Sequence, residues 1–179
     1  MDTSLARKLD GMKRWRDGLL GDLAAAGEAR LTWRPGGTAW SALDTVQHLV
    51  LVEEGVVGYA RKKLLGPPQP DGGLPGRLRF ALFVAAMRSP LRFRAPVPQV
   101  LPKETVPLAR LQERWTEGGA ALRALLEGLG EEREQALFFR HPVAGPLGPA
   151  ETVAFLHEHG RHHEAILRRA WASPGAPAA

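Results

Sequence analysis

The chain contains no cysteine, which excludes disulfide bonds, thiolate metal sites and a cysteine nucleophile. Any bound metal must therefore be held by nitrogen or oxygen ligands. Long apolar runs are also missing. The best candidate, residues 80–87, falls far short of the roughly 20 residues of a membrane span and has arginines at its ends. The first seven residues lack the apolar centre of a signal peptide, so we expect a cytoplasmic protein without a membrane span.

Lysine is scarce, and most of the positive charge behind the net charge of +5 comes from arginine. Abundant Gly, Pro, Ala and Leu are typical of a bacterial protein encoded by a GC-rich genome. The modest positive charge favours phosphates or small anions and is weak evidence for nucleic acid. One basic stretch is interleaved with phenylalanines and contains Arg77, Arg79, Arg88, Arg92 and Arg94. We interpret it as a helix packed on the body of the protein with solvated arginines, and we expect no nucleic-acid partner.

Apolar residues recur at spacings of three and four, which is typical of amphipathic helices. The pattern predicts a first helix from Leu5 to Leu23 and a second that follows Ser41, its N-cap, and ends near Leu65. Asp44 takes the acidic position of a capping box in the second helix. The Pro-Gly-Gly run at residues 35–37 should interrupt regular structure between these two helices.

A proline-rich and basic connection, residues 69–107, follows the second helix and contains one short predicted helix at 75–88. The third long helix is predicted at 108–129, where Gly118-Gly119 marks a weak or closely packed point. After a turn at 141–149, the fourth runs from about Ala150 through Leu167.

Four such helices predict an all-α fold, a four-helix bundle with a long crossover between the second and third helices. The length of 179 residues suits one domain, which we place at residues 1–172. Residues 173–179 are rich in Pro, Ala and Gly and should form a flexible C-terminal tail.

The histidines carry the strongest functional signal, because five of the six are His48 and the four that lie within residues 157–163. His159 and His163 are four residues apart and so share one helix face. His48 would complete a triad of imidazoles that holds a divalent ion and leaves a coordination position open, as in catalytic sites. The alternatives are a histidine patch on the surface and, for a lone residue such as His141, an ordinary hydrogen-bonding role.

These motifs resemble a known family. The run Leu-Thr-Trp-Arg-Pro at residues 31–35, then Trp40-Ser41, His48-Leu49 and Glu53, resembles the signature of the DinB-like (YfiT-like) four-helix-bundle metalloproteins. Residues 159–163, His-Gly-Arg-His-His, resemble the second motif of that family. The resemblance extends over essentially the whole chain and includes a basic linker at residues 88–102.

The resemblance implies that His48, His159 and His163 bind a divalent metal ion such as zinc, nickel or manganese. His162 matches a neighbouring histidine that is not a ligand in this family, and His157 has no assigned role. Glu53 is either a residue that supports the ligands or a solvated acid, as is Glu54. Trp40 is expected to pack at the start of the second helix, and Arg161 to be solvated.

The resembled family includes S-transferases that join low-molecular-weight thiols to electrophiles, together with one isomerase branch. The expected function is therefore a metal-dependent thiol S-transferase whose partners are a small thiol and an electrophile. The absence of cysteine fits this expectation, since the thiol is then a cosubstrate. Two alternatives remain open: a non-catalytic, metal-stabilised stress-response bundle and a metal-dependent hydrolase. A homodimer is a further expectation.

Overall fold

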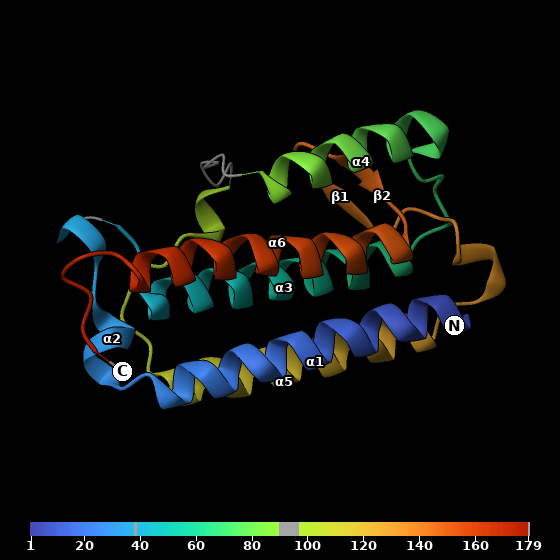
Figure 1. The fold of residues 1–179 in the computed structure, drawn as a ribbon. Helices are drawn as coiled ribbons and strands as arrows, with labels where there is room; N and C mark the ends of the chain where they lie inside the picture. The colour runs from blue at the N-terminus through green and yellow to red at the C-terminus, as the bar shows by residue number, and fades with distance from the viewer. Residues whose placement is uncertain (38, 90–96, 179) are drawn as a thin grey trace.

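The computed structural model describes residues 1–37, 39–89 and 97–178, most of which are helical (Figure 1). Four long helices lie side by side: α1 (Thr3–Ala25), α3 (Ala42–Leu64), α5 (Leu108–Glu127) and α6 (Pro149–Trp171). Helix α3 contacts α5 and α6, and α1 contacts the same two helices, so the four close into a bundle. The predicted all-α bundle is confirmed.

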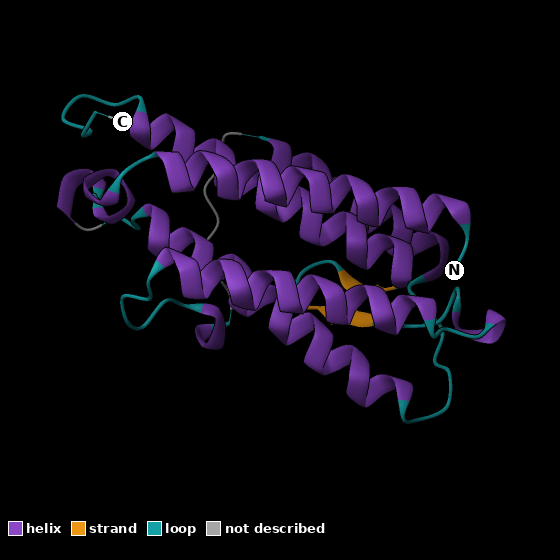
Figure 2. Ribbon diagram, turned by 90° about the horizontal axis from the view of Figure 1, so that it is seen from below, coloured by secondary structure: helices purple, strands orange, loops and turns teal. Residues whose placement is uncertain are grey.

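The connections carry shorter elements. These are α2 (Glu28–Thr32), η1 (Pro35–Gly37), α4 (Gly73–Arg88), η2 (Pro98–Val100), η3 (Glu131–Arg133), β1 (Phe139–His141) and β2 (Gly145–Leu147). The strands β1 and β2 pair antiparallel, with Phe139 opposite Leu147. Figure 2 shows this small hairpin among the helices.

The start of α3 follows the capping signal in the sequence. The hydroxyl of Ser41 accepts a hydrogen bond from the backbone N–H of Asp44 at 3.2 Å, and the Asp44 carboxylate accepts one from the backbone N–H of Ser41 at 2.8 Å. Both donors would otherwise be unpaired in the first turn, so this capping box fixes where α3 begins. The starting point of α3 determines on which side of the helix each following residue lies, including His48.

Two connections are more ordered than the sequence indicated. A turn of helix, α2, precedes the Pro-Gly-Gly run, and the run itself forms a 3-10 turn instead of ending all regular structure. Gly36 and Gly37 have φ values of 61° and 76°, a left-handed backbone that glycine adopts without strain. The second case is the predicted turn at residues 141–149, most of which belongs to the hairpin formed by β1 and β2. Its strands of three residues are too short to produce an alternating pattern.

The long crossover between α3 and α5 contains α4, which begins at Gly73, two residues before the predicted start. Helix α4 packs on α6 and on the hairpin, as Figure 1 shows, and the turn η2 packs on α3. Residues 90–96 of the predicted basic linker, with Arg92 and Arg94, lie outside the described residues. Within the described ranges, no helix is both long and apolar enough to cross a membrane.

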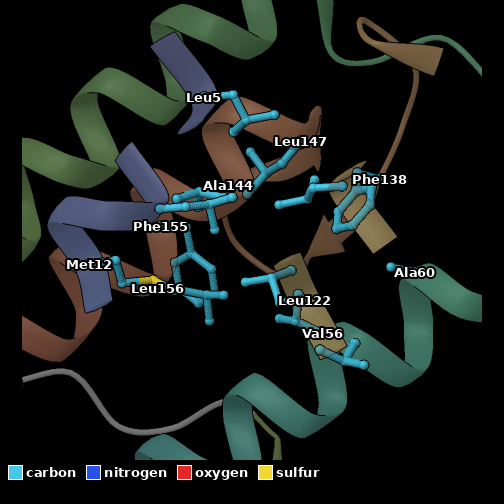
Figure 3. Close-up of a cluster of buried hydrophobic side chains, with 14 of the residues drawn as sticks. Leu5, Met12, Val56, Ala60, Leu122, Phe138, Ala144, Leu147, Phe155 and Leu156 are labelled. Carbon is cyan, nitrogen blue, oxygen red and sulfur yellow. The ribbon is translucent and has the colours of Figure 1, made fainter. Parts of the chain in front are cut away.

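The apolar core falls into two clusters along the bundle. The larger one gathers residues of α1, α3, α5, α6 and the hairpin, among them Met12, Val56, Leu122, Phe138 and Phe155 (Figure 3). The smaller one lies nearer the start of α3 and contains residues such as Leu23, Val46, Val50, Leu111 and Trp115. The predicted histidine site borders the larger cluster, because Phe155 of that cluster stacks on His159.

Candidate metal centre

Three histidines from two helices converge on one point. The Nε2 atom of His159 in α6 lies 3.3 Å from Nε2 of His48 in α3 and 3.2 Å from Nε2 of His163. One ligand atom from each of the three residues lies within 4.8 Å of the others. The structure therefore brings together the triad that the sequence indicated, from positions more than 100 residues apart.

The local geometry of each helix explains the convergence. His159 and His163 are one helical turn apart, so both rings project from the same face of α6. His48 is 3% exposed and lies on the buried face of α3, which packs against α6. No rearrangement of the helices is needed to assemble the triad.

The orientation of His48 is fixed by a backbone carbonyl. Its Nδ1 lies 2.8 Å from the carbonyl oxygen of Val100 in η2. A carbonyl only accepts hydrogen bonds, so Nδ1 carries the proton, and Nε2 presents a lone pair to the other two imidazoles. A hydrogen bond of this kind sets the tautomer and the ring orientation of metal-binding histidines. Val100 could not be identified from the sequence, because the backbone carbonyl of any residue at that place would accept the same hydrogen bond.

Electrostatics keep these imidazoles neutral. Burial is the main cause that lowers the pKa of His163 to about 3, and the neighbouring His48 and His162 contribute to this shift. Burial, followed by repulsion from His163 and His48, holds the pKa of His159 well below its ordinary value, and burial also lowers the pKa of His48. At neutral pH all three rings are therefore uncharged, which is the form that binds a metal.

The spacing of the nitrogens fits a metal ion. For Zn–N bonds of about 2.0–2.1 Å in a tetrahedron, neighbouring nitrogens are about 3.3 Å apart. The two Nε2 contacts, at 3.2 and 3.3 Å, have this length. Without a cation, a single proton on Nε2 of His159 would have to serve both neighbouring rings. A divalent ion would satisfy all three lone pairs at once, so the donor set fits the group.

Two aromatic rings lie against the triad. Phe155 stacks on His159 with ring centroids 5.4 Å apart, and Trp40 lies 5.0 Å from His48 and 6.1 Å from His163. Trp40 immediately precedes the Ser41 cap, and its expected packing role at the start of this helix includes direct contact with two rings of the triad. These apolar neighbours limit the access of water to the imidazoles.

A comparison with protein families adds an independent observation. The model of the DinB superfamily matches residues 12–167, a span that includes all three converging histidines. The chain belongs to the DinB superfamily. No curated protein and no solved structure matches the chain. The matched span covers α3, the crossover and α5 in full and most of α1 and α6.

The other histidines of this DinB-superfamily chain have separate places. The Nδ1 atom of His162 is 2.6 Å from the carbonyl oxygen of Met87, to which it donates, so it ties α6 to α4. His157 packs beside Trp15, with centroids 5.6 Å apart. In the hairpin, Nδ1 of His141 accepts hydrogen bonds from two backbone N–H groups of the turn. The surface-patch alternative does not describe the cluster at residues 157–163, because His162 is buried and none of its other three histidines is fully exposed.

Glu53 is not solvated. Among the described residues, its side chain has no contact with the histidine triad. It is 4% exposed, and its carboxylate accepts hydrogen bonds from the Trp115 indole at 2.9 Å and from Arg16 at 3.2 Å. Burial raises the pKa of Glu53 to about 7, against the opposing effects of Arg16 and Trp115. Glu54, by contrast, pairs with Arg114 at a partly exposed position, and Arg161 is exposed as expected.

Gly118 and Gly119 provide the space for this buried ion pair. A Cβ at Gly119 would lie 2.2 Å from Nη1 of Arg16, and one at Gly118 would lie 3.4 Å from the Glu53 carboxylate. The two glycines thus mark a closely packed point. Their partners could not be found from sequence, since Arg16 and Glu53 are on other helices.

Proposed function

We propose that this protein binds one divalent metal ion through His48, His159 and His163, and that it transfers a low-molecular-weight thiol to an electrophile at that site. The observation that carries the proposal is the convergence of three neutral imidazole nitrogens at 3.2 and 3.3 Å. Three protein ligands leave at least one coordination position for an exogenous group, as in catalytic zinc sites.

The nature of the ligands narrows the metal. All three are imidazoles, and no thiolate is available from this chain. Imidazole suits zinc and nickel, whereas manganese prefers carboxylate and water oxygens. Of the three metals implied by the family resemblance, zinc and nickel are therefore favoured over manganese.

The residues of the chain prepare the site for this chemistry. Val100 holds His48 in the tautomer with a free Nε2, and Trp40 and Phe155 shield the imidazoles from water. A divalent ion bound there would supply positive charge that lowers the pKa of a thiol at the open position. In the overall transfer, the sulfur–carbon bond forms, the leaving group departs with its electron pair, and the thiol proton passes to solvent.

A turnover assay tests the transfer. Metal-loaded protein would be incubated with an alkylating electrophile and, in turn, with glutathione, cysteine, bacillithiol or mycothiol. We expect the consumption of one thiol to follow metal occupancy, to be lost in His163→Ala, and to persist in His157→Ala. The second variant is a matched control because His157 belongs to the same helix but packs on Trp15.

Two other results would assign a different function. Turnover of an ester or amide without any thiol would indicate a hydrolase that uses metal-activated water. A structural role is supported by the position of the triad, which would link α3 to α6 through the ion. In that case no thiol would be consumed, and chelation would lower only the melting temperature.

A further inference from the structure

Helix α4 is apolar on two opposite faces. Its inner face packs on the larger core cluster through Phe80, Phe83, Val84 and Met87. Its outer face carries Leu74, Leu78 and Leu82, whose side chains are 79%, 64% and 65% exposed. The apolar face of a helix is normally covered by other parts of a protein, and among the described residues only the inner face of α4 is covered. The outer face of α4 therefore has the character of an interaction surface.

The charged residues of α4 do not interrupt this outer face. The helix contains three arginines and no acidic residue. Arg79 donates to the carbonyl oxygen of Ala144 at 2.8 Å, Arg88 pairs with Glu158, and Arg77 lies 3.9 Å from Glu151. All three thus interact with α6 or the hairpin of their own chain. A membrane surface would instead be recognised by basic side chains left free beside the apolar face.

The outer face of α4 has large side chains in its N-terminal half and mainly small ones in its C-terminal half, so two antiparallel copies of the face fit together. Leu74 and Leu78 occupy the N-terminal half, and Ala81 and Ala85, both exposed, continue the same face at helical spacing. If two copies of α4 pair antiparallel about a two-fold axis, Leu74 of one copy meets Ala85 of the other, and Leu78 meets Ala81. The same register places Leu82 over the aliphatic stem of Arg77 in the second copy.

Charge favours this antiparallel arrangement over a parallel one. Parallel pairing would set the arginines of one helix beside the same arginines of the other. Antiparallel pairing brings the end that carries Arg88 beside the opposite end of the second copy, where Asp71 lies just before the helix. It also opposes the two helix dipoles, which is favourable.

We propose that the outer face of α4 is the interface of a homodimer, in which the α4 helices of two copies pair antiparallel. The helix has 16 residues and is about 24 Å long at roughly 1.5 Å per residue. One face of a helix this long buries less area than the about 800 Å² per partner that a standard stable interface buries. The dimer is therefore reversible and depends on protein concentration.

Sedimentation velocity over a range of concentrations tests the interface. The wild-type chain shifts from monomer to dimer, and Leu78→Glu remains monomeric, because a charge in the seam would be buried without a partner. Leu65→Glu is the matched control, since Leu65 is 90% exposed but lies outside α4. A dimer that persists in Leu78→Glu, or a wild-type chain that stays monomeric throughout, overturns the proposal.

Engineered cysteines test the orientation without interference, because the chain has none of its own. Leu74→Cys/Ala85→Cys forms a covalent dimer on oxidation, whereas Leu74→Cys alone does not. The two positions are about 16 Å apart within one helix, too far for an internal disulfide. Efficient cross-linking of Leu74→Cys alone would indicate parallel pairing and contradict the proposed register.

The size complementarity of the seam can be tested separately from non-specific association of apolar surfaces. Ala85→Leu enlarges the seam and weakens the dimer, and the double variant Leu74→Ala/Ala85→Leu restores it by exchanging the large and small partners. If Ala85→Leu instead strengthens association, the face is a non-specific apolar surface. Monomers that bind vesicles of anionic phospholipid through Leu78 would assign the face to a membrane and would likewise overturn the proposal.

Discussion

Two polar clusters are buried in the same bundle, and α3 supplies a residue to each. Around Glu53, the carboxylate accepts from Arg16 and from the Trp115 indole, and Arg16 also donates to the Trp115 carbonyl oxygen at 2.9 Å. Around His48, three imidazole nitrogens face one another with too few protons to satisfy them. The first cluster finds its partners within the chain, whereas the facing nitrogens of the second would be satisfied only by a cation from outside the chain. The difference separates a structural cluster from a binding site.

Removal of Glu53 should have the largest effect on stability. Glu53→Ala leaves Arg16 charged, buried and without its carboxylate, so we expect a loss of about 3–5 kcal/mol in the free energy of unfolding. Chemical denaturation measures this loss. The neighbouring Glu54→Ala breaks only the partly exposed pair with Arg114 and should cost no more than about 1 kcal/mol. Equal losses for the two variants would show that the Glu53 cluster is not the buried, self-contained unit described above.

Protonation of His141 at acidic pH should have the next largest effect on the stability of the fold. Burial lowers the pKa of His141 to about 4, from an ordinary value of 6.5. Because the folded-state pKa is the lower one, the stability contribution is complete above pH 6.5 and is lost as the pH falls towards 4. At about 1.4 kcal/mol per pKa unit, the loss is about 3 kcal/mol.

The matched variant for this test is His141→Asn, whose side-chain oxygen can accept the two N–H groups of the turn but does not titrate. Unfolding would be measured between pH 7 and pH 4, in the presence of a chelator to remove the effect of bound metal. The wild-type chain should lose more stability over this range than the variant. Parallel curves would rule out His141 as the titrating group.

Substitution of the two neighbouring glycines should have the smallest effect and tests the packing of the Glu53 cluster. Gly119→Ala places a Cβ 2.2 Å from a guanidinium nitrogen of Arg16 that is already hydrogen-bonded, so we expect a net loss of about 1–3 kcal/mol. Gly118→Ala meets its nearest atom only at 3.4 Å. It should be neutral or gain up to about 1 kcal/mol from helix propensity. The melting temperatures of the two variants decide this, and the reverse order would refute the packing explanation.

The sequence predicted what local physics controls. The spacing of three and four residues placed the long helices, and the Ser41 and Asp44 pair placed the start of α3, because both signals act within one or two helical turns. The spacing of His159 and His163 likewise placed two ligands on one face. The resemblance around His48 supplied the third.

Features that depend on distant partners could not be predicted. The burial of Glu53 requires Arg16 and Trp115, which are 37 and 62 residues away. The tautomer of His48 requires a carbonyl of the crossover, 52 residues away. The hairpin was missed because its strands have only three residues each and β2 contains a proline.

The central claim, that the imidazole cluster is completed by one divalent ion, is tested most directly by metal content. Protein purified without a histidine tag would be loaded with zinc, dialysed and subjected to elemental analysis. The account predicts one equivalent per chain in the wild type and in His157→Ala, and severe loss in His48→Ala, His159→Ala and His163→Ala. A full equivalent of tightly bound metal in these three variants would contradict it.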